Sequence, residues 1–102
     1  MARMTRPRDI EEAALLAKVL GDPNRMKMVT ILAFDGPASV NELCGTLKLP
    51  QPTVSHHLGL LRMAKVVETR RAGKRVYCSV HKNLPRASGF RDLTKLLAKL
   101  GG

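Results

Sequence analysis

Apolar residues recur every three or four positions along the first third of the chain, which is typical of helices with one buried face. The spacing predicts a first helix over 9–20, with Asp9 as its N-cap and Gly21 as its stop. A second helix is predicted to open at Asp22-Pro23, because Asp caps helices and proline is favoured in the first turn. Residues 35–37 (Asp-Gly-Pro) are predicted to end it. Its buried stripe is expected to consist of Met26, Val29, Leu32 and Ala33.

The middle of the chain combines a capping signal with two more helical stretches. Ser39 and Glu42 have the spacing of a capping box, in which each side chain accepts a hydrogen bond from the backbone N–H of the other residue. The pair predicts a short helix that reaches about Thr46. Residues 47–50 are predicted to form a tight turn, and a longer helix is predicted over 51–64. Its buried face is expected to consist of Val54, Leu58 and Leu61.

After this helix, the pattern changes to two runs that favour β-strands. Residues 66–71 and 74–80 are predicted strands, joined at Ala72-Gly73, where glycine supplies the positive φ of a tight hairpin turn. A last helix is predicted over 86–100, and residues 1–8 are predicted to form a disordered basic tail. The apolar face of the last helix is expected to consist of Phe90, Leu93, Leu96, Leu97 and Leu100.

The order of these elements predicts the fold class. A short capped helix, a tight turn and a second helix have the dimensions of a helix-turn-helix, and the hairpin that follows corresponds to a wing. We therefore expect a mainly α (α+β) fold, a winged helix-turn-helix with about five helices and a two-stranded β-hairpin wing. With 102 residues the chain has room for one compact domain, which is predicted over 9–100.

Charge is distributed unevenly along the chain. The formal net charge is +10, and residues 48–86 contain nine basic residues and one acidic residue, Glu68. Before residue 48 the two signs nearly balance. Such a segment favours a surface that binds a polyanion. An anionic membrane is a poorer match, because the basic residues do not lie on one amphipathic helix.

Cellular location and thiol state follow from what the sequence lacks. No stretch is long and apolar enough to span a bilayer, and the N-terminus has no apolar run of the kind a signal peptide needs. A cytoplasmic protein with reduced thiols is therefore expected. Cys44 is expected to be a small core residue, and a disulfide between Cys44 and Cys78 is not favoured.

The exposed face of the helix predicted over 51–64 carries polar groups and no acidic residue. Helices that face only solvent usually include Glu or Asp, so this absence indicates a negatively charged partner. We predict that the helix enters the major groove of double-stranded DNA, where Gln is suited to a bidentate contact with adenine. The residues predicted to reach base edges or flanking phosphates are Gln51, Thr53, Ser55 and His56.

Other side chains near this helix are assigned different roles. His57 is one step from Leu58 and lies partly towards the core, so a hydrogen-bonded structural role is favoured. Cationic side chains are predicted to bind phosphates or an adjacent minor groove, which adds affinity but little sequence information. They are Arg62, Arg70, Arg71, Lys74 and Arg75. No residue is predicted to be catalytic, because the sequence has no Ser/His/Asp set, carboxylate pair or phosphate-binding glycine loop.

Three segments together resemble the arsenic-repressor (ArsR/SmtB) family of winged-helix regulators. They are Asp22-Pro23-x-Arg25 at the start of a helix, Val54-Ser55-His56-His57-Leu58 followed by Leu61-Arg62, and Arg71-x-Gly73-Lys74 in the wing. The resemblance covers roughly residues 10–82. It implies a homodimer joined through the first and last helices, repression by occupancy of an operator, and release by an inducer. Lys65 stands where the family usually has glycine, and lysine tolerates positive φ poorly.

Metal sensing is the best-known activity of that family, and its usual ligands are incomplete in this chain. Glu42-Leu43-Cys44 matches the pattern on the third helix, but Thr46 stands where a second thiolate is needed. The other known site uses Asp and His on the last helix, whereas residues 86–100 contain Asp92 and no histidine, and His81 is isolated after the wing. We predict no metal and no cofactor. A metal- or thiol-responsive repressor that uses Cys44 is the alternative.

A second class of function would use the same basic surface without reading sequence. An architectural protein would show little preference between DNA sequences, whereas a winged-helix dimer should prefer an inverted repeat. RNA binding usually requires exposed aromatic side chains, and Tyr77 and Phe90 are expected to be buried. These patterns do not identify the operator, the regulated genes or the inducer.

Overall fold

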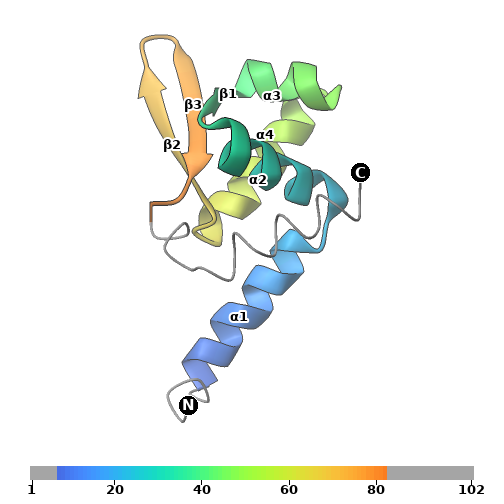
Figure 1. Ribbon diagram of the computed structural model, residues 1–102, viewed down its shortest axis with the longest axis vertical. Coiled ribbons are helices and arrows are strands. Elements are labelled where there is room, and N and C mark those ends of the chain that lie inside the picture. The colour runs from blue at the N-terminus through green and yellow to red at the C-terminus, as the bar shows by residue number, and fades with distance from the viewer. Residues whose placement is uncertain (1–6, 83–102) are drawn as a thin grey trace.

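The computed structural model describes residues 7–82, which contain four helices and one three-stranded antiparallel sheet (Figure 1). In Figure 1, α1 (Pro7–Leu20) projects from a body formed by the other elements. They are α2 (Pro23–Asp35), β1 (Ala38–Ser39), α3 (Val40–Leu47), α4 (Gln51–Met63), β2 (Val67–Ala72) and β3 (Arg75–Val80). α3 and α4 form the predicted helix-turn-helix, and β2 and β3 form the wing. The helix predicted over 86–100 and residues 1–6 of the predicted tail lie outside the described residues.

The start of α1 differs from the prediction. The helix begins at Pro7, so Asp9 lies inside it and is not its N-cap, and Pro7 and Arg8 are helical rather than part of a tail. Proline is favoured in a first turn because its missing N–H would have no helical partner there. The end is as predicted, since α1 stops at Leu20, directly before Gly21.

The start of α2 confirms the predicted cap. Asp22 is extended, and its Oδ2 accepts a hydrogen bond from the backbone N–H of Arg25 at 3.0 Å. The helix ends at Asp35, where Gly36 takes a φ of +92°. The buried residues of α2 are Met28, Val29 and Leu32, so the prediction missed Met28, while Met26 and Ala33 are only partly buried. The buried surface of α2 is wider than the predicted single stripe, because the helix packs against α1, α4 and β3.

The start of α3 carries the predicted capping box and also a short strand that was not predicted. The Oγ of Ser39 accepts from the Glu42 N–H at 3.1 Å, and the Oε1 of Glu42 accepts from the Ser39 N–H at 3.3 Å. Ala38–Ser39 form β1, which pairs with β3 and places Ala38 opposite Cys78. The strand joins the first helix of the helix-turn-helix to the wing.

Both helices of the helix-turn-helix end at a lysine in the left-handed region. Lys48 has a φ of +56° after α3, and Lys65 has a φ of +59° after α4. The N–H of Lys65 donates to the Arg62 carbonyl at 3.0 Å, and the N–H of Val66 donates to the Leu61 carbonyl at 2.9 Å. These two bonds form a Schellman motif. The chain therefore adopts at Lys65 the conformation that lysine tolerates poorly.

The wing is a regular hairpin whose turn lies one residue later than predicted. Ala72 pairs with Arg75, so the two central residues of the turn are Gly73 and Lys74. Gly73 has a φ of +64°, as predicted for the glycine, and the φ of Lys74 is not positive. Positive φ at the first central position only is the pattern of a type II′ turn, which matches the twist of the strands.

The core lies where α2, α4 and the sheet meet. It confirms the predicted buried face of α4 and also contains Cys78, while Cys44 is partly buried against it, and both cysteines are free thiols. The wing aromatic Tyr77 is only partly buried, and Phe90 lies outside the described residues. The buried members are Val19, Met28, Val29, Leu32, Ala38, Leu43, Val54, Leu58, Leu61, Val66, Val67 and Cys78. Within residues 7–82, no helix combines the length and the apolarity needed to cross a membrane.

Candidate nucleic-acid interface

α4 presents a polar face without carboxylates. Four of the residues predicted for DNA contact are exposed on it, and Thr53 is partly buried. The opposite face is anchored in the core by Val54, Leu58 and Leu61, which fixes the direction in which the polar side chains point. The exposed residues are Gln51, Ser55, His56 and Arg62.

The beginning of α4 is electrically suited to a negative partner. Pro50 precedes the helix in an extended conformation and supplies no side-chain cap. The first turn contains no acidic residue, so no carboxylate neutralises the positive end of the helix dipole. Backbone N–H groups at such a helix start bind water or an anion such as a phosphate.

The wing tip carries four exposed cationic side chains, as predicted. Its register places Arg70 opposite Tyr77 and Arg75 opposite Ala72 on one face of the hairpin. Arg71 lies opposite Val76 on the other face. The cations are therefore divided between the two faces, so the tip can contact phosphates on either side of it. The exposed members are Arg70, Arg71, Lys74 and Arg75.

The acidic residue of this basic segment lies away from the tip. Glu68 stands near the base of the wing, where its Oε2 is 3.9 Å from the Nε2 of His81. That distance is too long for a hydrogen bond but short enough for electrostatic attraction when the imidazole is protonated. Residues 70–75 of the tip contain no acidic residue of their own.

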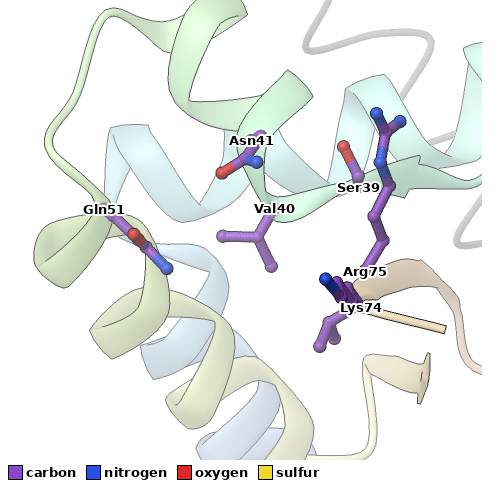
Figure 2. Close-up of a pocket in the computed structure, with 7 residues that line it drawn as sticks. Ser39, Val40, Asn41, Gln51, Lys74 and Arg75 are labelled. Atoms are coloured by element: carbon purple, nitrogen blue, oxygen red, sulfur yellow. The ribbon is translucent and has the colours of Figure 1, made fainter. Parts of the chain in front are cut away.

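A cavity of about 150 Å³ joins the wing to the helix-turn-helix (Figure 2). In Figure 2, Gln51 of α4 lies on one side and Arg75 of the wing on the other, with Val40 and Asn41 of α3 between them. The cavity brings Gln51, predicted to contact bases, onto the same concave surface as two cations predicted to contact phosphates. Its lining residues are Ser39, Val40, Asn41, Gln51, Lys74, Arg75 and Val76.

Asn41 is a candidate contact that sequence reasoning did not identify. It is exposed in the first turn of α3 and lines the cavity beside Gln51. Its position in the first helix of the helix-turn-helix could have identified it, because that helix crosses the DNA backbone. In the sequence, Asn41 stands between Ser39 and Glu42 of the capping box, and that motif gives it no part of its own.

His57 lies outside the polar face and partly towards the core, as predicted. Its side chain is 12% exposed, and its Nδ1 lies 3.3 Å from the Nη1 of Arg25 and 4.0 Å from the Oδ2 of Asp22. The hydrogen bond from the Arg25 backbone N–H holds the pKa of the Asp22 carboxyl below its usual value, although partial burial acts in the opposite direction. Asp22 therefore stays a carboxylate beside the guanidinium and the imidazole.

Neither cysteine belongs to the exposed face of α4 or to the wing tip, because Cys44 lies on α3 and Cys78 is buried in β3. Burial raises the pKa of the Cys78 thiol, which keeps it in the protonated form that is a poor nucleophile and a poor metal ligand. Cys44 is partly buried and Thr46 is exposed. In the described part of the chain, no three or more His, Cys, Asp or Glu side chains are grouped so that they could hold a metal ion. Asp92 lies outside the described residues.

An exposed helix without acidic residues, preceded by a capped helix and followed by a basic hairpin, defines the winged helix-turn-helix class of DNA-binding proteins. Comparison with known proteins agrees with this class. The family described as "Bacterial regulatory protein, arsR family" matches residues 22–69. The chain belongs to the arsR family, and it is a winged-helix transcriptional regulator.

Individual relatives support the family over most of the chain. The transcriptional repressor PagR of Bacillus anthracis is 38% identical over 84 residues, which are 82% of each protein. The crystal structure of PagR matches with a TM-score of 0.74 and 33% identity, covering 90% of this chain and 99% of that one. The transcriptional repressor BigR of Xylella fastidiosa matches with a TM-score of 0.76 and 32% identity, covering 98% and 96%.

A further relative is an uncharacterised HTH-type transcriptional regulator of Methanocaldococcus jannaschii. It is 43% identical over 63 residues, which are 62% of this chain and 71% of the relative. The matched region covers 62% and 56% of the length of two other curated relatives, so those proteins extend well beyond it.

Proposed function

We propose that the protein is a homodimeric repressor that occupies an inverted-repeat operator in double-stranded DNA and is released by an unidentified signal. The observation that carries the proposal is the acid-free face of α4 beside the basic wing tip, with one cavity shared between them. PagR and BigR, which resemble this chain, are themselves described as repressors. Because the ligand is chromosomal DNA, the proposal places the protein in the cytoplasm.

The two parts of the interface have separate tasks in this proposal. The exposed side chains of α4, led by Gln51 and Ser55, read base edges in the major groove. The cations of the wing tip, together with Arg62, bind phosphates and set the register of the protein on the duplex. Asn41 joins this second set, because the cavity places it between Gln51 and Arg75.

The dimer rests on α1 and on the family resemblance. In the C-terminal half of α1, Val19 is buried and Leu16 and Leu20 pack against the core. Farther towards the N-terminus, Ile10 is 56% exposed and Leu15 is 50% exposed on a helix that projects from the body (Figure 1). A second copy would cover this apolar surface. The last helix is the other proposed part of the interface and lies outside the described residues.

Selection of bound duplexes from a random pool tests the proposed operator. Light scattering of the free protein measures its mass and tests the proposed dimer. We expect an enriched inverted repeat whose half-sites lie about 10–10.5 base pairs apart, or a multiple of that spacing. The mass should be twice that of one chain. Binding without any enriched sequence would support an architectural protein instead, and a strict monomer on and off DNA would contradict the paired half-sites.

A further inference from the structure

Two motif residues that are not part of the DNA-contact surface, Arg25 and His57, meet in the folded protein. The Asp22-Pro23-x-Arg25 motif opens α2, and His57 lies in the middle of α4. The two are 32 positions apart in the chain, yet the Nη1 of Arg25 lies 3.3 Å from the Nδ1 of His57. The neighbouring His56 is exposed and belongs to the proposed DNA surface, so adjacent histidines have different surroundings.

Arg25 is a residue of α2, and its side chain contacts two other helices. Its Nε donates to the Val19 carbonyl at 2.7 Å, which satisfies one of the carbonyls that the last turn of α1 leaves without a helical partner. Its own backbone N–H donates to Asp22 at the start of α2. Its Nη1 reaches His57 of α4. The guanidinium therefore links the end of α1 to α4, and the Arg25 backbone is held by the cap of α2.

A hydrogen bond from Arg25 is compatible with only one tautomer of a neutral His57 ring. A guanidinium can only donate hydrogen bonds, so the Nδ1 that faces it must accept, and the proton lies on Nε2. Asp22 does not compete for that proton position, because its Oδ2 is 4.0 Å from the same Nδ1, beyond hydrogen-bond range. Asp22 instead acts through its charge, which offsets the partial burial of the guanidinium.

We propose that Arg25 and His57 are positioning residues that fix the tilt of α4 relative to α1, and hence the spacing of the two recognition helices in the dimer. The inference rests on the proposed function, because α1 is the proposed dimer helix and α4 is the proposed reading helix. His57 lies between exposed His56 and buried Leu58, so a change of tilt at this contact displaces the whole polar face. The preferred distance between half-sites then depends on one polar contact.

The test uses four substitutions in the full chain and one double variant. Arg25→Met and His57→Leu remove the donor and the acceptor, and the double variant completes a cycle that isolates their coupling. His57→Gln keeps an acceptor oxygen. Lys27→Met is the matched control, because it removes the same charge from an exposed position of the same helix.

The first measurement is the ¹⁵N NMR spectrum of the His57 ring without DNA. We expect a proton on Nε2 and none on Nδ1, with the Nδ1 resonance displaced by Arg25→Met and unchanged by Lys27→Met. A proton on Nδ1, or a ring that does not respond to Arg25→Met, would overturn the inference. This readout needs no operator and tests the contact by itself.

The second measurement is affinity for the selected operator and for versions with half-sites one base pair closer or farther apart. Arg25→Met and His57→Leu should each reduce the preference for the native spacing by about tenfold, since hydrogen bonds to charged groups are worth roughly that factor. The double variant should be no worse than either single one, and His57→Gln and Lys27→Met should keep the preference.

Two outcomes separate the possible failures. If the wild type binds its operator but the Arg25 and His57 variants weaken all spacings alike, the contact is structural only and the inference is wrong while the proposed function stands. If the wild type binds no duplex, the proposed function fails and the positioning role fails with it, whatever the NMR spectrum shows of the contact.

Discussion

α4 and the wing border the same cavity, yet the protein holds them in different ways. Three side chains of α4 are buried in the core, and His57 is held by Arg25. In the wing, every residue from Arg70 to Arg75 is exposed, so the tip is held only by the ladder of the hairpin. Packing against the core therefore fixes α4, whereas the cationic wing tip has no buried side chain to hold it.

The difference corresponds to the two tasks of a DNA-binding surface. Reading base edges requires side chains held to within a fraction of an ångström, which a helix backed by a core provides. Phosphate contacts tolerate more freedom, because a cation gains most of its attraction without exact geometry. The comparison therefore predicts that changes in or behind α4 alter folding and specificity, whereas changes in the wing alter affinity for all DNA.

The largest expected effect is a loss of stability when a side chain on the buried face of α4 is removed. Leu61→Ala should lower the free energy of unfolding by about 2–5 kcal/mol, because it removes a fully buried side chain and leaves a cavity. Arg71→Ala at the exposed wing tip should change it by less than about 0.5 kcal/mol. Urea denaturation followed by circular dichroism measures both values. Equal losses would contradict the difference in support between the two regions.

The next effect concerns specificity. Gln51→Ala should reduce the preference for the operator over a scrambled duplex by about 1–3 kcal/mol, while affinity for the scrambled duplex stays nearly unchanged. Competition binding with both duplexes measures this preference. A uniform loss on both would assign Gln51 to phosphate contact and remove it from the base-reading set.

A third effect tests the cap at the start of α2, which also supports the contact behind α4. Asp22→Ala should destabilise the protein by about 0.5–2 kcal/mol, because the backbone N–H of Arg25 loses its acceptor. Asp22→Asn keeps an acceptor and should cost less.

The charge of Asp22 gives this prediction a pH dependence. Its folded-state pKa is lowered, so its contribution is present above the unfolded value of about 3.9 and is lost as the pH falls through the lower folded value. The stability difference between wild type and Asp22→Asn should therefore shrink when the pH is lowered from 7 into this acidic range. A stability difference that grows on acidification would mean that folding raises the pKa of Asp22 rather than lowering it.

A smaller effect is expected at Lys65, in the segment that joins α4 to the wing. Lys65→Gly should raise the free energy of unfolding by about 0.5–1 kcal/mol, because glycine adopts positive φ without strain. This gain is larger than the additional conformational entropy that glycine loses on folding. Lys65→Ala should give no such gain. Thermal unfolding measures both, and an equal response to Gly and Ala would show that the φ angle is not the cause.

The smallest effect is expected at the wing tip. Arg75→Ala should weaken binding to operator and scrambled duplexes by the same factor and reduce the salt slope of binding by about 1 for each protomer. Anisotropy titrations at several salt concentrations give the slope. A selective loss on the operator would mean that the wing reads sequence and would remove the distinction from α4.

The helices were predictable because their signals are local. Asp22-Pro23 and the Ser39–Glu42 pair specify helix starts within a few residues, and the spacing of Val54, Leu58 and Leu61 specifies the polar face of α4. Exposure of Gln51, Ser55, His56 and Arg62 followed from that periodicity, whereas Thr53 is partly buried. The start of α1 was missed because Asp9 is an acceptable cap residue and Pro7 is equally acceptable in a first turn.

The features that were missed depend on partners far along the chain. β1 has two residues and exists because β3 pairs with it, so no alternation could reveal it. The cavity beside Asn41 and the contact between Arg25 and His57 arise from the packing of separate elements. Arg25 and His57 each belong to a motif that the sequence revealed, but only the fold brings the two residues together.

Equilibrium binding to the selected operator and to a scrambled duplex of the same composition, between 50 and 200 mM salt, tests the interface most directly. With about 6–10 phosphate contacts for a dimer, affinity should fall by roughly 10³–10⁵ over this range, along parallel lines with the operator always bound more tightly. Binding that barely responds to salt, or no binding to either duplex at 50 mM, would contradict the assignment of α4 and the wing to DNA.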